Sequence, residues 1–298
     1  MTQVIECEGA PRDLGFDQGT HCRAVLNAAY RSRSRWQRAR LRLLAESDAC
    51  RRVRLEIRRF YPQQAEMMQA MARASRVPVS WLIAILTGNL PTAAPADALV
   101  LAAASAMTDR GGLLARALPG DAIVRRSRPE SGFRSIELTQ PWRTAPLAGV
   151  NEAGFAVACV SNSGGVAESR HAASAALLAH DCLRRFDGLD GAISWLLVRP
   201  GGGKSTLVLT DLSGEIAGVS IDGDERMVFR PADDLIVHTG GHARQGEIEK
   251  GLREASPLLS SDLGRFFGMP LVVVEPNRQR IGLLGARSAR EADRWFEV

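Results

Sequence analysis

The chain lacks long apolar runs and any segment typical of export. Among its 298 residues, no stretch of about 18 consecutive apolar residues occurs, so the sequence predicts no transmembrane helix. The first residues, Met1 to Glu6, lack the basic and apolar regions of a signal peptide. We therefore expect a cytoplasmic protein that has no membrane partner.

The chain has few cysteines, and their spacing fits neither a disulfide framework nor a metal site. The five cysteines are an odd number without a CxxC pair, which argues against disulfides and against a thiolate metal site. We interpret them as reduced packing residues. His238 and His242 are spaced like a metal pair on a helix, but Gly240 and Gly241 interrupt any helix there. No third ligand is evident, so the sequence predicts no metal and no other cofactor.

Lysine is nearly absent, so the positive charge comes from arginine. The net charge is +5, and only Lys204 and Lys250 are lysines. Many arginines fall between Arg23 and Arg59, in a segment whose pattern is helical. Clustered guanidiniums can bind nucleic-acid phosphates, but aromatic residues do not interleave with them and no nucleic-acid module is recognisable. We favour a solvated helix face and expect no nucleic-acid partner.

The chain divides at a loop rich in helix-breaking residues. Residues 1–97 are predominantly helical in pattern and end in the loop 87–97, which carries glycine and two prolines. After this loop the pattern changes to short strands and helices. Leu99 to Leu118 predicts a hairpin that turns at Thr108 to Gly112. With 45% hydrophobic residues, the chain can bury a large core, and the order of elements predicts an α+β layered fold.

Glycine and asparagine recur at positions that a known family shares. Gly9, Gly15 and Gly19 lie near the start, and the run Gly149-x-Asn151-Glu152-x-Gly154 precedes an apolar strand. Together these positions resemble the acyl-coenzyme A:6-aminopenicillanic acid acyltransferase family of N-terminal-nucleophile (Ntn) hydrolases. The resemblance implies a four-layer αββα sandwich with an N-terminal helical segment. Residues 1–97 would then match the small subunit and residues 98–298 the large subunit, within one compact unit.

The resemblance also implies a mechanism whose main groups are missing here. Members of the family cleave themselves before a cysteine, which then attacks a carbonyl while an asparagine and backbone amides hold the oxyanion. Ala98 stands at or next to the place of the cysteine, with Leu99 as the alternative alignment. Ala117 and Gly240 replace two asparagines. We therefore expect an uncleaved chain without the Cys-dependent acyl transfer.

Some polar residues lie near the positions at which the resemblance implies a catalytic residue that this chain lacks. The pocket candidates are Arg116, Asp121, Cys159, Asn162 and His238. Our first hypothesis is a pseudoenzyme that binds an acyl- or amide-containing small molecule. A second is a retooled enzyme that uses the same pocket without a covalent intermediate. A third is an active amide hydrolase or acyltransferase with a displaced nucleophile. The sequence leaves open whether the protein forms a homo-oligomer.

Overall fold

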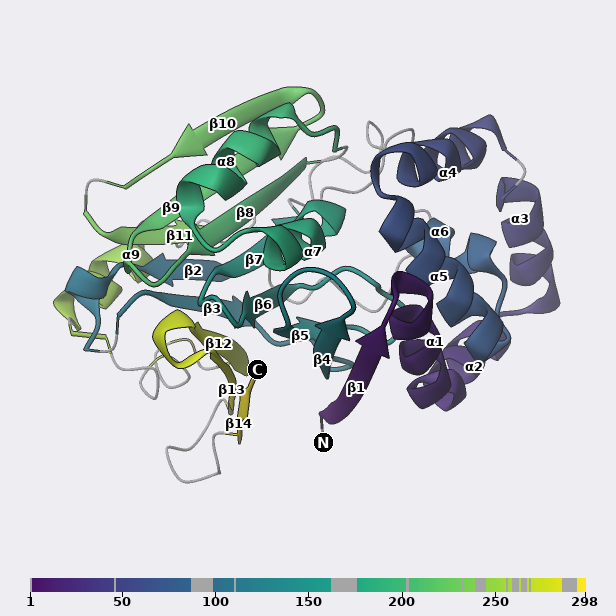
Figure 1. Cartoon of the computed structure of the whole chain (residues 1–298), viewed down its shortest axis with the longest axis horizontal. Helices are drawn as coiled ribbons and strands as arrows, with labels where there is room; N and C mark the ends of the chain where they lie inside the picture. Colours follow the sequence, from purple (N-terminus) through teal and green to yellow (C-terminus); the bar gives the residue numbers. More distant parts are fainter. Residues whose placement is uncertain are drawn as a thin grey trace.

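The computed structural model places two β-sheets and helices on either side of them (Figure 1). It describes residues 2–45, 47–86, 99–109, 111–161, 176–201, 204–231, 233–238, 245–255, 257–258, 263, 267, 269–285 and 294–298. No helix in these ranges is long and apolar enough to cross a membrane.

The N-terminal part is helical, as its pattern predicted. Its helices are α1 (Pro11–His21), α2 (Arg23–Arg31), α3 (Arg35–Ala45), α4 (Asp48–Phe60), α5 (Pro62–Ser75) and α6 (Val79–Leu86). Helix α4 ends at Phe60, and α5 starts two residues later at Pro62. Proline has no N–H and suits a first helical position, so it separates the two helices.

The first sheet has eight strands. In sheet order they are β1 (Gln3–Gly9), β4 (Ile123–Pro129), β5 (Ser135–Thr139), β6 (Ala148–Asn151), β7 (Ala156–Ser161), β8 (Lys204–Thr210), β9 (Ile216–Asp222) and β10 (Glu225–Phe229). Only the β1–β4 pair is parallel, and the remaining neighbours are antiparallel. Two helices, α7 (Ala176–Arg185) and α8 (Leu189–Val198), cover one face of this sheet (Figure 1).

The second sheet has six antiparallel strands. In sheet order they are β11 (Leu235–His238), β2 (Val100–Ala103), β3 (Leu113–Ala117), β12 (Leu271–Glu275), β13 (Arg280–Leu284) and β14 (Arg294–Glu297). The predicted hairpin is confirmed by β2 and β3, which pair in register from Val100 opposite Arg116. Helix α9 (Gln245–Glu254) packs beside β11. Two short 3-10 helices, Ser105–Met107 and Pro276–Arg278, follow β2 and β12.

Three hydrophobic clusters define four layers. One cluster lies between the helices and the first sheet, and it includes Met67 of α5 and Leu178 of α7. A second lies between the two sheets, with Val100 and Val208 among its members. The third lies on the outer face of the second sheet, where Leu252 of α9 packs. This order of helix, sheet, sheet and helix is the αββα sandwich that was predicted.

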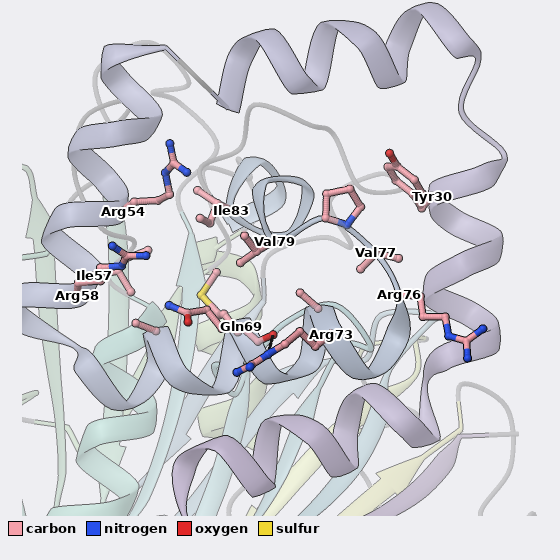
Figure 2. Close-up of a pocket in the computed structure, with 14 residues that line it drawn as sticks. Tyr30, Arg54, Ile57, Arg58, Gln69, Arg73, Arg76, Val77, Val79 and Ile83 are labelled. Atoms are coloured by element: carbon pink, nitrogen blue, oxygen red, sulfur yellow. Dashed lines mark hydrogen bonds between the residues drawn. The ribbon is translucent and has the colours of Figure 1, made fainter.

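The early glycines permit a close helix crossing. A Cβ atom on Gly15 would overlap the backbone of Met67, and one on Gly19 would overlap that of Met71. Glycine is therefore required where α1 lies against α5. On its other side, α5 contributes to a cavity of about 780 Å³, whose walls come from α2, α4, α5, α6 and the α5–α6 connection (Figure 2).

Candidate functional site

Three residues lie in one row across the second sheet. Val100 pairs with Arg116 on one side and with His238 on the other. Paired residues in a sheet present their side chains on the same face. Val100 belongs to the cluster between the sheets, so Arg116 and His238 face that space as well. Both residues were pocket candidates, and the sheet brings them to the two sides of Val100.

Arg116 connects the two sheets. Its Nε donates a hydrogen bond to the carbonyl oxygen of Cys159 on β7 at 3.0 Å, and its Nη1 donates one to the carbonyl oxygen of Ala117 at 3.1 Å. Burial lowers the pKa of Arg116 to about 10, with the Cys159 thiol acting in the opposite direction and the charge of Arg143 adding to the decrease. The guanidinium therefore stays cationic at neutral pH.

A second partly buried arginine, Arg143, lies nearby, and it was not among the pocket candidates. It follows β5, and its Nε is buried without a hydrogen-bond partner in the described structure. Burial lowers the pKa of Arg143, while the Cys159 thiol and the Asp121 carboxylate act in the opposite direction. Asp121 accepts a hydrogen bond from Nε2 of Gln140 at 2.8 Å. The segment Gln140 to Arg143 resembles an ordinary polar turn, so no local pattern signals its burial.

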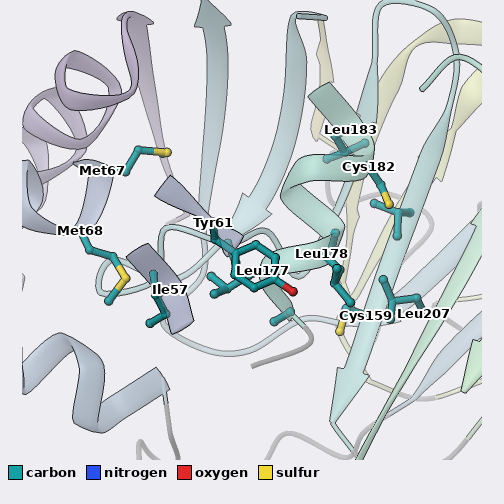
Figure 3. Packing of buried hydrophobic residues seen from close by; sticks show 14 of the residues in the cluster. Ile57, Tyr61, Met67, Met68, Cys159, Leu177, Leu178, Cys182, Leu183 and Leu207 are labelled. Atoms are coloured by element: carbon teal, nitrogen blue, oxygen red, sulfur yellow. The ribbon is translucent and has the colours of Figure 1, made fainter. Parts of the chain in front are cut away.

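Cys159 takes part in this region through its backbone. Its neighbours Ala158 and Val160 face the space between the sheets, and its thiol lies on the opposite face among the helix-side residues. Figure 3 shows the thiol beside Leu178, Cys182 and Leu207. Burial raises the pKa of Cys159 to about 11, against the lowering effect of Arg116 and Arg143. The thiol is therefore protonated at neutral pH.

The described start of β2 is apolar. Leu99 and Ala117 are both buried on the outer face of the second sheet, and the Ala117 N–H donates to the carbonyl oxygen of Leu99 at 3.1 Å. Three further predicted positions, Ala98, Asn162 and Gly240, lie outside the described residues.

The row of residues that contains His238 offers hydrogen-bond donors but no nucleophilic side chain. Burial lowers the pKa of the half-buried His238, so its imidazole is neutral at pH 7. The row continues from Arg116 through Val272, Leu283 and Arg294, and none of its six residues is Cys, Ser or Thr. Within the described parts of the chain, no group of three His, Cys, Asp or Glu residues could hold a metal ion. This chemistry suits binding of a carbonyl oxygen or an anion.

The Gly149 to Gly154 run supports the first sheet beneath this region. Asn151 Nδ2 donates to the carbonyl oxygens of Leu183 and Phe186, each at 2.8 Å, so it anchors the end of α7. Its Oδ1 accepts from the N–H groups of Ala153 and Phe155. Gly154 has φ +77°, a conformation that glycine adopts without strain. The motif is a structural turn in this chain.

Comparison with known proteins gives a likeness to solved structures only. No family profile matches the chain, and no curated protein matches it. Penicillin V acylase from Agrobacterium tumefaciens is 12% identical, with 67% of this chain and 86% of that chain covered and a TM-score of 0.46. The N-acylethanolamine-hydrolyzing acid amidase ortholog of Caenorhabditis elegans is 13% identical, with coverages of 60% and 93% and a TM-score of 0.48.

A mutant of the conjugated bile acid hydrolase from Clostridium perfringens is also similar. It is 9% identical, with 67% of this chain and 92% of that chain covered and a TM-score of 0.46. At these identities the likeness concerns the fold alone.

Proposed function

We propose that this chain binds an acyl- or amide-containing small molecule between its two sheets and does not cleave itself. The observation that carries the proposal is the unpartnered, buried Nε of Arg143 close to Arg116. A buried donor without a partner costs free energy, and a bound carbonyl oxygen would satisfy it. Ala98 in place of a cysteine removes the thiol on which cleavage and covalent acyl transfer depend in the Ntn hydrolases that the sequence resembles.

We further propose that residues 1–97 and 98–298 act as one compact unit. Support comes from the cluster on the helix side, which joins Met67 and Met71 of α5 to Leu178 of α7 and Cys159 of β7. Separating the two parts would expose this shared apolar surface to water, which is unfavourable. An uncleaved connection between them is consistent with that shared core.

A second candidate function is turnover without a covalent intermediate. The neutral imidazole of His238 favours it, because a neutral histidine can accept a proton from water or from a substrate. Arg116 and Arg143 would then polarise the carbonyl group. This hypothesis predicts product formation that His238→Ala abolishes.

The test uses a neutral amide, N-methylhexanamide, so that charge attraction does not contribute to binding. Calorimetric titration gives the affinity, and mass spectrometry of the ligand after long incubation shows whether the amide is cleaved. We expect binding without cleavage, and Arg143→Gln should weaken binding about tenfold or more. Arg134→Gln is the matched control, because Arg134 is exposed and paired with Glu152.

The outcomes separate the hypotheses. Cleavage that His238→Ala abolishes would replace the binding proposal with the retooled enzyme. Cleavage that a thiol reagent abolishes would support a displaced cysteine nucleophile. Equal affinities for the Arg143→Gln variant and the unsubstituted protein would show that the buried guanidinium is not the binding group.

A further inference from the structure

The N-terminal helices enclose a cavity that none of the predicted site residues lines. Its volume is about 780 Å³, which lies in the range of small-molecule pockets. Most of the wall is apolar and comes from α4, α5, α6 and the connection between α5 and α6. These apolar lining residues are Ile57, Ala65, Met68, Ala72, Val77, Pro78, Val79 and Ile83. Tyr30 of α2 closes one side (Figure 2).

The polar part of the same wall is strongly positive. Arg54 and Arg58 come from α4 and Arg73 comes from α5, and no aspartate or glutamate is among the described lining residues. In the part of the chain that the structure describes, Arg58 and Arg73 form no ion pair. Arg73 Nε makes only a long hydrogen bond, 3.4 Å, to the carbonyl oxygen of Gln69 (Figure 2). Elsewhere, exposed arginines such as Arg230 pair with acidic residues.

A fourth arginine lies at the rim in an unusual backbone conformation. Arg76 ends α5 with φ 58° and ψ 37°, which is the left-handed region. Glycine or asparagine is the usual residue at this position of a helix end, because other residues are strained there. Figure 2 shows the guanidinium of Arg76 directed away from the cavity, so we assign it no part in binding the anion.

We propose that this cavity binds a small amphiphile that has one apolar chain and a single anionic group, a carboxylate or a phosphate monoester. The apolar wall would take the chain, and the guanidiniums of Arg54, Arg58 and Arg73 would take the anion. This site goes beyond the proposed function, since it shares no residue with the row of His238, Val100 and Arg116.

The test compares octyl phosphate and octanoate with their separate halves, octanol and inorganic phosphate, by calorimetric titration. We expect saturable 1:1 binding of octyl phosphate, octanoate or both, about tenfold or more tighter than either half. The anion that binds with the higher affinity identifies the head group that the cavity prefers. Binding should weaken about tenfold in the double variant Arg58→Gln/Arg73→Gln, which removes two exposed charges and keeps side-chain length.

Three controls make the result specific. Arg52→Gln removes an exposed arginine of the same helix that does not line the cavity, and it should leave the affinity unchanged. His238→Ala should also leave it unchanged, which separates this cavity from the site between the sheets. Arg76→Gly should likewise leave the affinity unchanged, and it should not lower the thermal midpoint, because glycine relieves the left-handed strain.

Two results would overturn the proposal. One is equal affinity for octyl phosphate, octanoate and inorganic phosphate, which would mean that the apolar wall takes no part. The other is cosedimentation with vesicles of phosphatidylcholine and phosphatidylglycerol when both monomeric amphiphiles fail to bind. The arginines would then recognise a membrane surface instead of a single molecule.

Discussion

The Nε atom of Arg116 lies 3.0 Å from the main-chain carbonyl oxygen of Cys159 and donates a hydrogen bond to it. A side chain of the second sheet thus holds the backbone of the first sheet. Arg116→Ala should lower the free energy of unfolding by about 2–4 kcal/mol, because it removes the donor and leaves a cavity. Urea denaturation measures the change. Arg134→Ala, at an exposed ion pair, should cost less than about 1 kcal/mol, and an equal loss in both variants would argue against the inter-sheet role of Arg116.

The crossing of α1 and α5 depends on glycine. Gly15→Ala adds a Cβ atom that overlaps the backbone of Met67, so we expect a loss of about 1–3 kcal/mol in the free energy of unfolding. The matched control is Gly246→Ala in α9, where a Cβ atom meets nothing within 4 Å. That substitution should be neutral or stabilise by up to about 1 kcal/mol. A Gly15→Ala variant with an unchanged free energy of unfolding would contradict the close packing of the two helices.

A buried histidine should make stability depend on pH. His180 has neither ring nitrogen hydrogen-bonded, and burial lowers its pKa to about 3, against the raising effect of Glu137. Between about pH 6.5 and pH 3 the unfolded chain binds a proton at this residue and the folded chain does not. The free energy of unfolding should therefore fall as the pH falls through that window.

The contribution of His180 can be isolated above pH 5. There, His180→Leu should reduce the pH slope of the unfolding free energy by up to about 1.4 kcal/mol per pH unit. An unchanged slope in the His180→Leu variant would contradict the buried, neutral state of His180 in the folded protein.

The cysteines should be inert in the folded protein. All five are buried, and burial raises the pKa of Cys7 to about 12 and those of Cys22 and Cys159 to about 11. A thiol-specific reagent at pH 8 should label none of them rapidly, and it should label all five after unfolding in guanidinium. One fast-reacting cysteine in the folded protein would support the displaced nucleophile.

The sequence predicted the elements whose residues follow a simple pattern. The β2–β3 hairpin was expected from its turn residues and its flanking apolar runs. Strand β4 has no such simple pattern, because its buried Arg125 interrupts the apolar alternation. The structure pairs Arg125 with Glu137 through an Nε–Oε2 distance of 3.1 Å, and Thr144 supplies a further acceptor. Such a partner is distant in sequence, so no local pattern reveals it.

The site was predicted only in part for the same physical reason. Arg116 and His238 were chosen from the family resemblance, and sheet pairing places them on either side of Val100. Arg143 was missed because its burial comes from the packing of the whole fold. The arginines of α4 were interpreted as a solvated face, and Arg54 and Arg58 also line a cavity that only the packing of several helices creates.

We propose that Ala98 leaves this chain without a nucleophile, so that it does not mature by cleavage. The intact mass of the purified protein under denaturing conditions tests this proposal. We expect a single species near 32.2 kDa. Two chains split near residue 97 would refute the proposal, because such a cut requires a nucleophile.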